Sequence, residues 1–271
     1  MAYSAGLGDM LDCYVDTTRE SGIVAHPLFS ICVEWPAIEA SRDLLYQHGL
    51  TPDERSRVVH STHDVEVHRL VQPGDQLVNR ATILSVKAMR SGAIVLVRVD
   101  TLDQENAVVA STSQGHVYRN VVVCGKSPPL NKFAPVDPNR IHRQPRPYKT
   151  IKQRIEANAA HLYTECARIF NPIHTDLAFA KASGLPGTIL HGSATLALAV
   201  SNIVRELGEG NPGGVLRIYG KFRGIVRLPS TIETIIYAPS TDADRLNVRF
   251  EVLNAEGEPA IADGLIAIAT S

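Results

Sequence analysis

The segment from Gly192 to Leu207 most constrains how this chain folds, because it is apolar on nearly every side. Its composition predicts a helix, and a helix without a polar face is normally enclosed by other structure. A long antiparallel sheet curled around the helix provides such an enclosure. A second, shorter helix is predicted from Ala37 to Tyr46, ahead of the strands of the first half.

The two halves of the chain repeat one pattern. Residues 67–77 and residues 222–232 each predict a strand, a tight turn and the start of a second strand. Residues 95–106 and 248–257 each predict an apolar strand that runs into turn residues tolerant of positive φ, which is a hairpin signal. A repeat of this length indicates a duplicated domain rather than a solenoid.

A proline-rich segment separates the halves. Residues 127–148 contain Pro128, Pro129, Pro135, Pro138, Pro145 and Pro147. Such a stretch cannot continue a helix or lie centrally in a sheet, so we expect an extended linker. The predicted halves are therefore residues 1–126 and residues 149–271.

The composition is that of an ordinary globular protein. The 271 residues are 44% hydrophobic and 20% charged, with a net charge of -1, which gives no bulk attraction to nucleic acid or anionic membranes. The apolar runs are shorter than the roughly 20 residues that span a bilayer, and no basic stretch precedes an apolar core at the N-terminus. The four cysteines are scattered, so we expect reduced thiols and a cytoplasmic location.

The candidate chemistry lies in two motifs. Asn171-Pro172-Ile173-His174 places a histidine in a proline-stiffened turn, and Ile189-Leu190-His191-Gly192 precedes the apolar helix. His174 has an unperturbed pKa near 6.5, so at pH 7 it is mostly neutral and can accept a proton. Gly192 opens a helix, where free N–H groups and the positive end of the helix dipole meet.

Water addition to an α,β-unsaturated thioester needs these two elements. A base takes a proton from water, and a donor stabilises the oxygen that becomes enolate-like. Structural roles remain open for the same residues: a buried histidine at 174, tight packing at Gly192 and a turn-shaping role for His191. Phe170 and Ile173 are expected in the core.

The two motifs resemble the signature of the MaoC-like (R)-specific enoyl-CoA hydratases, and Pro73-Gly74-Asp75 resembles their N-terminal half. The resemblance implies an α+β, double hot-dog fold. It implies that His174 is a general base, that Asn171 holds the water or the imidazole, and that the Gly192 N–H holds the thioester oxygen. We also expect a homodimer, an acyl-CoA or acyl-carrier substrate, and no cofactor or metal. The expected substrate contacts are Ile169, Pro172, Ile189, Leu190 and Ser193.

One residue departs from that pattern. The family has an aspartate two residues before the asparagine, and here that residue is Ile169. Isoleucine cannot position water or transfer a proton, and one positioned acid or base contributes about 100- to 10,000-fold in rate. Glu165 and Asp176 are the nearest carboxylates in sequence, and Asp176 is expected to cap a helix over residues 177–182.

Three functions remain open. The first is a hydratase or dehydratase with a modified acid–base set, acting on an enoyl or 3-hydroxyacyl thioester. The second is an isomerisation that uses His174 alone. The third is a non-catalytic acyl-thioester-binding or partner subunit. Thioester hydrolysis is disfavoured, because residues 192–199 contain no carboxylate.

A basic cluster in the second half has two interpretations. Its members are Arg217, Lys221, Arg223 and Arg227. They form either a solvated strand face or, at Lys221 and Arg223, a contact with the phosphates of coenzyme A.

Overall fold

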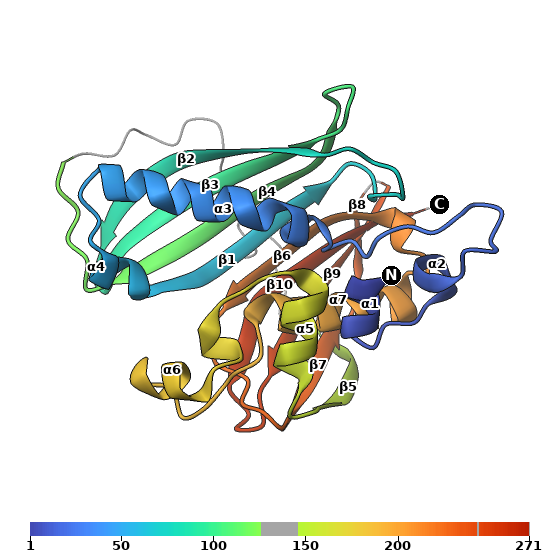
Figure 1. The fold of residues 1–271 in the computed structure, drawn as a ribbon. Coiled ribbons are helices and arrows are strands. Elements are labelled where there is room, and N and C mark those ends of the chain that lie inside the picture. The colour runs from blue at the N-terminus through green and yellow to red at the C-terminus, as the bar shows by residue number, and fades with distance from the viewer. Residues whose placement is uncertain (126–145, 243, 271) are drawn as a thin grey trace.

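The computed structural model describes residues 1–125, 146–242 and 244–270, and its main feature is one antiparallel sheet that carries helices on its surface (Figure 1). The strands are β1 (Val58–Val67), β2 (Val78–Met89), β3 (Gly92–Leu102), β4 (Val108–Arg119), β5 (Pro147–Ile155), β6 (Val215–Phe222), β7 (Ser230–Tyr237), β8 (Ser240–Asp242), β9 (Arg245–Leu253) and β10 (Pro259–Ala269). The helices are α1 (Ala2–Gly6), α2 (Asp12–Val15), α3 (Ser30–Gln47), α4 (Pro52–Ser56), α5 (Ala159–Ala167), α6 (Leu177–Ala182) and α7 (Gly192–Leu207), with short 3-10 turns η2 (Pro172–His174) and η3 (Pro212–Gly214).

The strand order confirms the predicted duplication. It runs β2-β3-β4-β1-β6-β10-β9-β7-β5, so corresponding strands follow outward from the central β1–β6 pair in each half, β4, β3 and β2 on one side and β10, β9 and β7 on the other. Each half has its own helix, α3 in the first and α7 in the second, and the two sheets join edge to edge. This joining removes two open edges, which are a liability for a sheet. The arrangement is the α+β double hot-dog that the sequence predicted.

The turns show the duplication at the level of single atoms. Asp103 accepts N–H bonds from Glu105 and Ala107 at 3.0 and 2.9 Å, and closes the β3–β4 turn. Asn254 accepts from Glu256 and Glu258 at 3.2 and 2.9 Å, and closes the β9–β10 turn in the same way. Both side chains satisfy backbone donors two and four residues ahead, which is how Asp and Asn favour turns.

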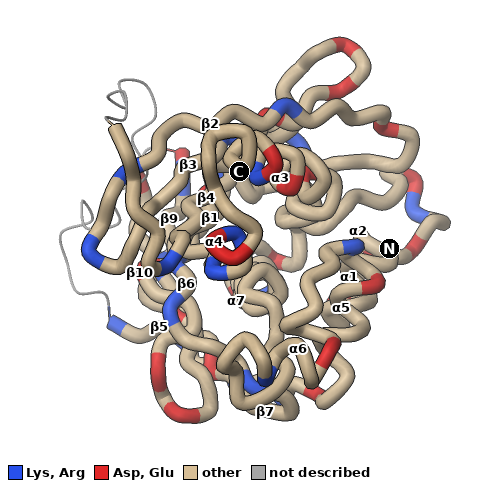
Figure 2. Tube along the Cα trace, turned by 60° about the vertical axis from the view of Figure 1, so that its left-hand side comes forward, with Lys and Arg blue, Asp and Glu red and all other residues tan. Residues whose placement is uncertain are grey.

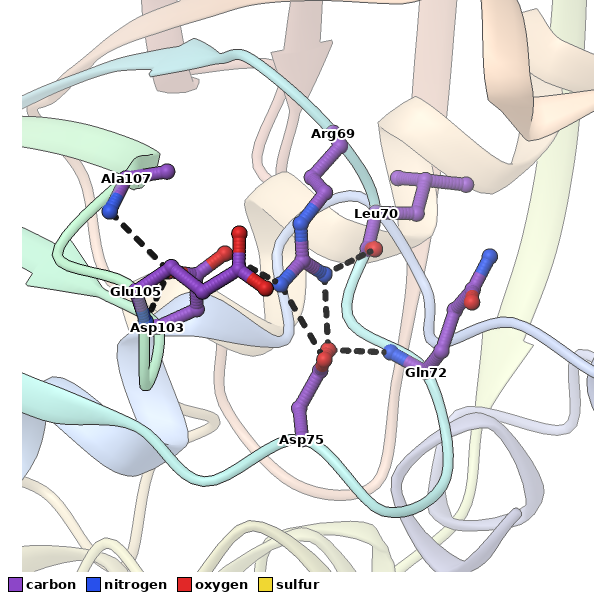
Figure 3. Close-up of polar contacts among 7 residues, drawn as sticks. All are labelled: Arg69, Leu70, Gln72, Asp75, Asp103, Glu105 and Ala107. Atoms are coloured by element: carbon purple, nitrogen blue, oxygen red, sulfur yellow. Dashed lines mark hydrogen bonds and ion pairs between the residues drawn. The ribbon is translucent and has the colours of Figure 1, made fainter.

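An arginine ties two loops of the first half together. Arg69 donates to both carboxylate oxygens of Asp75, at 2.8 and 3.0 Å, and to Asp103 at 3.1 Å (Figure 3). The loop that contains Pro73 and Gly74 is thereby fastened to the β3–β4 turn. The charge-assisted pair with Asp75 is bidentate, which is the stronger arrangement.

The helix α7 has the bounds that the apolar pattern predicted, and residues 193–201 are all buried. It packs on β6, β7, β9 and β10, whose buried side chains include Ile218, Ile232, Val248 and Ile266. Burying one aliphatic side chain of this size stabilises a fold by about 1.5–3 kcal/mol. Leu196 is 1% exposed, so Leu196→Ala is expected to cost about 2–5 kcal/mol.

The helix α3 is longer than predicted. The pattern indicated Ala37 to Tyr46, whereas the helix begins at Ser30 and contains Pro36. Its first turns carry Glu34, a buried carboxyl that accepts hydrogen bonds from Thr112 at 2.7 Å and Thr101 at 3.4 Å. The first part of the helix was missed in the sequence because a charged residue and a proline interrupt its apolar periodicity.

Most of the predicted linker lies outside the described residues, since residues 126–145 are not among them. Its last two residues, Pro147 and Tyr148, belong to β5, so the predicted boundary at 148 was too late. β5 lies at the edge of the sheet, and Pro147 is its first residue. Proline is tolerated there because it has no N–H to contribute to a ladder.

Basic and acidic residues are interspersed along the described chain, and neither sign dominates the view in Figure 2. Among the described residues, no helix combines the length and apolar character needed to cross a membrane.

Candidate functional site

The loop before α6 is held by its own side chains. Asn171 is extended, with φ -136° and ψ 119°, as the following proline requires. Its Oδ1 accepts the Ile173 N–H at 3.3 Å. Asp176 accepts the Phe179 N–H at 2.9 Å and caps α6, which confirms the predicted capping role. These bonds fix the backbone on both sides of His174.

His174 is buried, with 8% of its surface exposed. Its Nδ1 lies 2.8 Å from the carbonyl oxygen of Ile189. Because a carbonyl only accepts, Nδ1 carries the proton and Nε2 keeps its lone pair. Within the described part of the chain, no side chain or backbone group bonds Nε2. Burial lowers the pKa of His174 to about 4, against a small opposing effect of the Ile189 carbonyl, so the ring is neutral at pH 7.

The ring of His191 stacks on that of His174. Their centroids are 3.6 Å apart and the planes differ by 24°. The Nε2 of His191 lies 3.2 Å from the Thr164 hydroxyl. Burial, and secondarily the neighbouring His174, lowers the pKa of His191 well below its usual value. His191 is also the N-cap residue of α7, in line with the predicted turn-shaping role.

Gly192 opens α7 beside an aromatic ring. A Cβ at this position would lie 2.8 Å from Cδ1 of Phe222, which is too close. The preceding segment is held against the connection between β6 and β7, because the Leu190 N–H donates to the Val226 carbonyl at 2.8 Å and Ile189 forms a bridge with Arg227. Close packing against Phe222 therefore requires a glycine here, and the first N–H groups of the helix have no intrahelical partner.

Ile169 is buried, at 5% exposure, and follows Arg168, whose φ of 56° ends α5 in the left-handed region. Glu165 is exposed on α5, and Asp176 is committed to capping. Neither neighbouring carboxylate takes the place left by the isoleucine. Burial lowers the pKa of His174 in spite of the opposing effect of the Ile189 carbonyl, and no carboxylate of the described residues contributes to the shift.

The other predicted substrate contacts differ in how deeply they are buried. Ile189 and Leu190 are buried, whereas Pro172 is exposed. Phe170 was expected in the core, but 55% of its surface is exposed, so that prediction was wrong. After the left-handed Arg168 that ends α5, Ile169 is buried and the ring of Phe170 faces solvent.

A chain of hydroxyl groups lies beside the histidine pair, and sequence reasoning missed it. Tyr163 donates to the Ser193 hydroxyl at 3.1 Å and lies 3.4 Å from the Tyr3 hydroxyl. The Tyr163 ring is also 4.9 Å from His191. Tyr3 reaches the site because α1 packs on α5, and no local motif marks that contact.

A crevice too narrow to hold a water lies between side chains of the two halves near these hydroxyl groups. It is lined by Leu28, Ile31, His63, Ser193 and Leu196. A single pocket shared by His174 and the Gly192 N–H remains a prediction, because the crevice wall includes Ser193 but neither of those residues. Among the described residues, no group of His, Cys, Asp or Glu is arranged to hold a metal ion.

Most of the basic cluster is paired with acids. Arg217 makes a bidentate bond to Asp64 at 2.8 and 2.7 Å across the β1–β6 junction, where the two halves meet. Lys221 lies 3.3 Å from Asp263, and Arg227 lies 3.5 Å from Glu256. Arg223 is exposed, and no described residue forms an ion pair with it. Three members are thus already neutralised by carboxylates, whereas Arg223 has no such partner among the described residues.

Comparisons with known proteins cover both halves. A MaoC-like domain matches residues 136–254, and a FAS1-like dehydratase domain region matches residues 2–112. The peroxisomal enoyl-CoA hydratase 2 of Arabidopsis thaliana is 24% identical over 172 residues, which are 62% of this chain and 55% of that protein. The chain thus spans about half the length of that relative.

A second curated relative and a protein of known crystal structure are named as dehydratases. The 3-hydroxyacyl-thioester dehydratase Y of Mycobacterium tuberculosis is 28% identical over 207 residues, 75% of this chain and 69% of that protein. The crystal structure of a MaoC-like dehydratase from Phytophthora capsici has a TM-score of 0.82 at 17% identity, covering 100% of this chain and 91% of that one, which shows the shared fold. The two matched regions together span most of the sequence, so the chain carries a MaoC-like domain and a FAS1-like dehydratase region, and it has the double hot-dog fold of the MaoC-like dehydratase structures.

Proposed function

We propose that this protein adds water to an enoyl thioester, or removes it from a 3-hydroxyacyl thioester, with His174 as general base. The observation that carries the proposal is the Nδ1 bond to the Ile189 carbonyl, which leaves the lone pair on Nε2. The names of the Arabidopsis and Mycobacterium relatives refer to the same two thioester classes. The relatives' activities support the reaction type but leave the role of each residue as our proposal.

The proposed reaction uses His174 for both proton transfers. Nε2 takes a proton from water while the oxygen of that water attacks C3 of the enoyl thioester. The Gly192 N–H, at the positive end of α7, stabilises the enolate oxygen. The imidazolium then returns its proton to C2, which completes the addition of one water. In this scheme the Asn171 amide orients the water.

Ile169 sets the expected rate. A partner carboxylate would share the proton transfers, and its loss lowers the rate by about 100- to 10,000-fold. The low pKa of His174 also makes the ring a weak base. We therefore propose a slow hydratase.

A second candidate function is thioester binding without turnover. It is favoured by the burial of Ile169, because an isoleucine then stands where a carboxylate is expected and no other carboxylate of the described residues replaces it. An isomerisation that uses His174 without water is a third, and it predicts movement of the double bond with no 3-hydroxyacyl product. In each case we place the reacting groups in residues 149–271 and propose that residues 1–126 shape the acyl pocket.

The cellular setting is also a proposal. The four cysteines are free, which supports a reducing compartment such as the cytoplasm. We propose a homodimer, which sedimentation of the purified protein can test.

Product analysis with crotonyl-CoA tests the proposed function. Wild-type protein is expected to form 3-hydroxybutyryl-CoA, and His174→Ala is expected to lose at least 100-fold in kcat/KM. His48→Ala, which removes an exposed histidine, is the control and should keep full activity. A double-bond isomer as product would favour isomerisation, and binding without product would favour a partner subunit. Equal turnover by His174→Ala and wild type would remove His174 from the mechanism.

A further inference from the structure

Three histidines that the proposed reaction does not use lie together in the first half; His63 and His116 are buried and His60 is half-buried. His60 and His63 are on β1, and His116 is on β4. The ring of His60 lies 5.2 Å from that of His116 and 5.6 Å from that of His63. The cluster faces the second half, since Phe222 on β6 lies 4.6 Å from His60.

Two members of the cluster have unsatisfied nitrogens. His60 contacts the Thr62 carbonyl oxygen at 3.0 Å. His63 is fully buried, and neither of its ring nitrogens has a hydrogen-bond partner among the described residues; Nε2 of His116 has none there either. Burial lowers the pKa of His63 to about 4 and that of His116 to about 3, so both are neutral at pH 7. A neutral imidazole offers one donor and one acceptor, and leaving both buried and unpaired costs free energy that a ligand would recover.

His63 faces the crevice between the halves. It lines the crevice with Ser193 and Leu196 of α7 and with Leu28 and Ile31. Opposite His63 in the sheet is Gly220, where a Cβ would lie 2.9 Å from the Leu196 side chain. The residue opposite His63 therefore has no side chain, and the side chain of Leu196 fills the space that a Cβ would take.

Two residues, Ser193 and Phe222, connect the crevice with the proposed thioester site. Ser193, in its wall, directly follows Gly192. Phe222, which packs on Gly192, also contacts His60. An acyl chain whose thioester oxygen lies at the Gly192 N–H can thus run past Ser193 toward His63. The walls of the crevice are otherwise aliphatic, which suits a hydrocarbon chain.

We propose that this crevice receives the acyl chain and that His63 selects chains bearing a hydroxyl group beyond the reacting carbons. The inference rests on the proposed function and narrows its substrate class. A hydroxyl both donates and accepts, so it satisfies whichever nitrogen of His63 faces it. The crevice is too narrow in this structure to hold a water, so the entering chain must part its walls, and the substrate hydroxyl meets an unsolvated imidazole.

The test compares plain and hydroxylated substrates on the same protein. The probes are trans-2-hexenoyl-CoA and its analogues with a hydroxyl at C4, C5 or C6. Wild-type protein is expected to show at least a tenfold higher kcat/KM for one hydroxylated isomer than for the plain chain. A site built around a polar partner rejects the analogue that lacks it.

Two variants make the comparison specific. His63→Phe keeps an aromatic ring of similar size and should abolish the preference while retaining turnover of the plain chain. His116→Phe removes another imidazole of the cluster that does not line the crevice, so it should keep the preference. The ratio of two substrates on one preparation is independent of the fraction of protein that is folded.

The outcomes separate the inference from the function on which it rests. Turnover of the plain chain without preference for any hydroxylated isomer would overturn the inference and leave the proposed function intact. A preference that survives in His63→Phe would also overturn it. Absence of both binding and turnover with all four thioesters would contradict the proposed function, and the inference with it.

Discussion

The imidazole of His174 lies face to face with that of His191, 3.6 Å between ring centroids, and each ring is held by a bond from a different segment. Ile189 fixes His174, and Thr164 fixes His191. Both rings are neutral at pH 7 because burial lowers both pKa values. A proton on one ring disfavours a proton on the other, so the pair carries at most one charge during a reaction.

Thr164→Val tests whether this pair depends on its hydrogen bond. The isosteric change leaves a buried nitrogen of His191 unpaired, so we expect a loss of about 1–3 kcal/mol in unfolding free energy. We expect kcat to fall with KM nearly unchanged, because the stacked rings lose their fixed orientation. Thr164→Ser keeps the hydroxyl and should behave like wild type. Urea unfolding and steady-state kinetics measure both effects, and equal behaviour of the two variants would contradict this account.

Ile169→Asp tests the departure from the family. A carboxylate near His174 is expected to raise crotonyl-CoA hydration tenfold or more, within the range for a positioned acid–base group. Since Ile169 is buried, the variant should lose several kcal/mol of stability, or hold the carboxyl protonated with a raised pKa. Ile169→Asn is the matched control, because it is polar but transfers no proton. A gain in both variants, or in neither folded variant, would count against the acid–base explanation.

Stability should depend on pH through His63. Burial lowers its pKa in the folded state to about 4, whereas the unfolded chain binds a proton near pH 6.5. The unfolded state therefore binds more protons between these values, so stability falls as pH decreases from about 6.5 to about 4 and is restored above 6.5. His63→Phe should flatten this slope by up to about 1.4 kcal/mol per pH unit.

Urea unfolding at several pH values measures the slope. The exposed His48 is the control position, and His48→Phe should leave the slope unchanged. A His63→Phe slope equal to that of wild type would mean that His63 is not buried as a neutral ring.

Arg223→Ala tests recognition of coenzyme A. Since Arg223 has no ion-pair partner in the described part of the chain, we expect it to contact a phosphate, whereas Lys221 is bound to Asp263. We expect a several-fold rise in KM for crotonyl-CoA and no change for crotonyl-N-acetylcysteamine, which lacks the nucleotide. The same rise with both substrates would exclude a phosphate contact.

Strong periodic patterns in the sequence predicted the fold well. The bounds of α7 follow from an apolar run with glycine at its start, and the repeated turns at Asp103 and Asn254 follow from local chemistry that needs no tertiary context. The start of α3 was missed, because Glu34 and Pro36 interrupt its pattern and tertiary bonds to Thr112 compensate for the buried carboxyl.

The site was predictable only where a motif is continuous in sequence. Asn171 and His174 were found through their spacing. Tyr3 and His63 were not, because they approach Ser193 only after α1 packs on α5 and β1 pairs with β6. Phe170 was misplaced, since an aromatic side chain beside a motif can face solvent when the preceding helix ends in a left-handed turn.

A crystal structure with a bound, unreactive butyryl-CoA tests the central claim most directly. The account predicts that the thioester oxygen lies about 2.7–3.2 Å from the Gly192 nitrogen, and that C3 of the acyl chain faces Nε2 of His174 across a space for one water. A thioester oxygen bound elsewhere, or an acyl chain on the far side of His191 from His174, would contradict it.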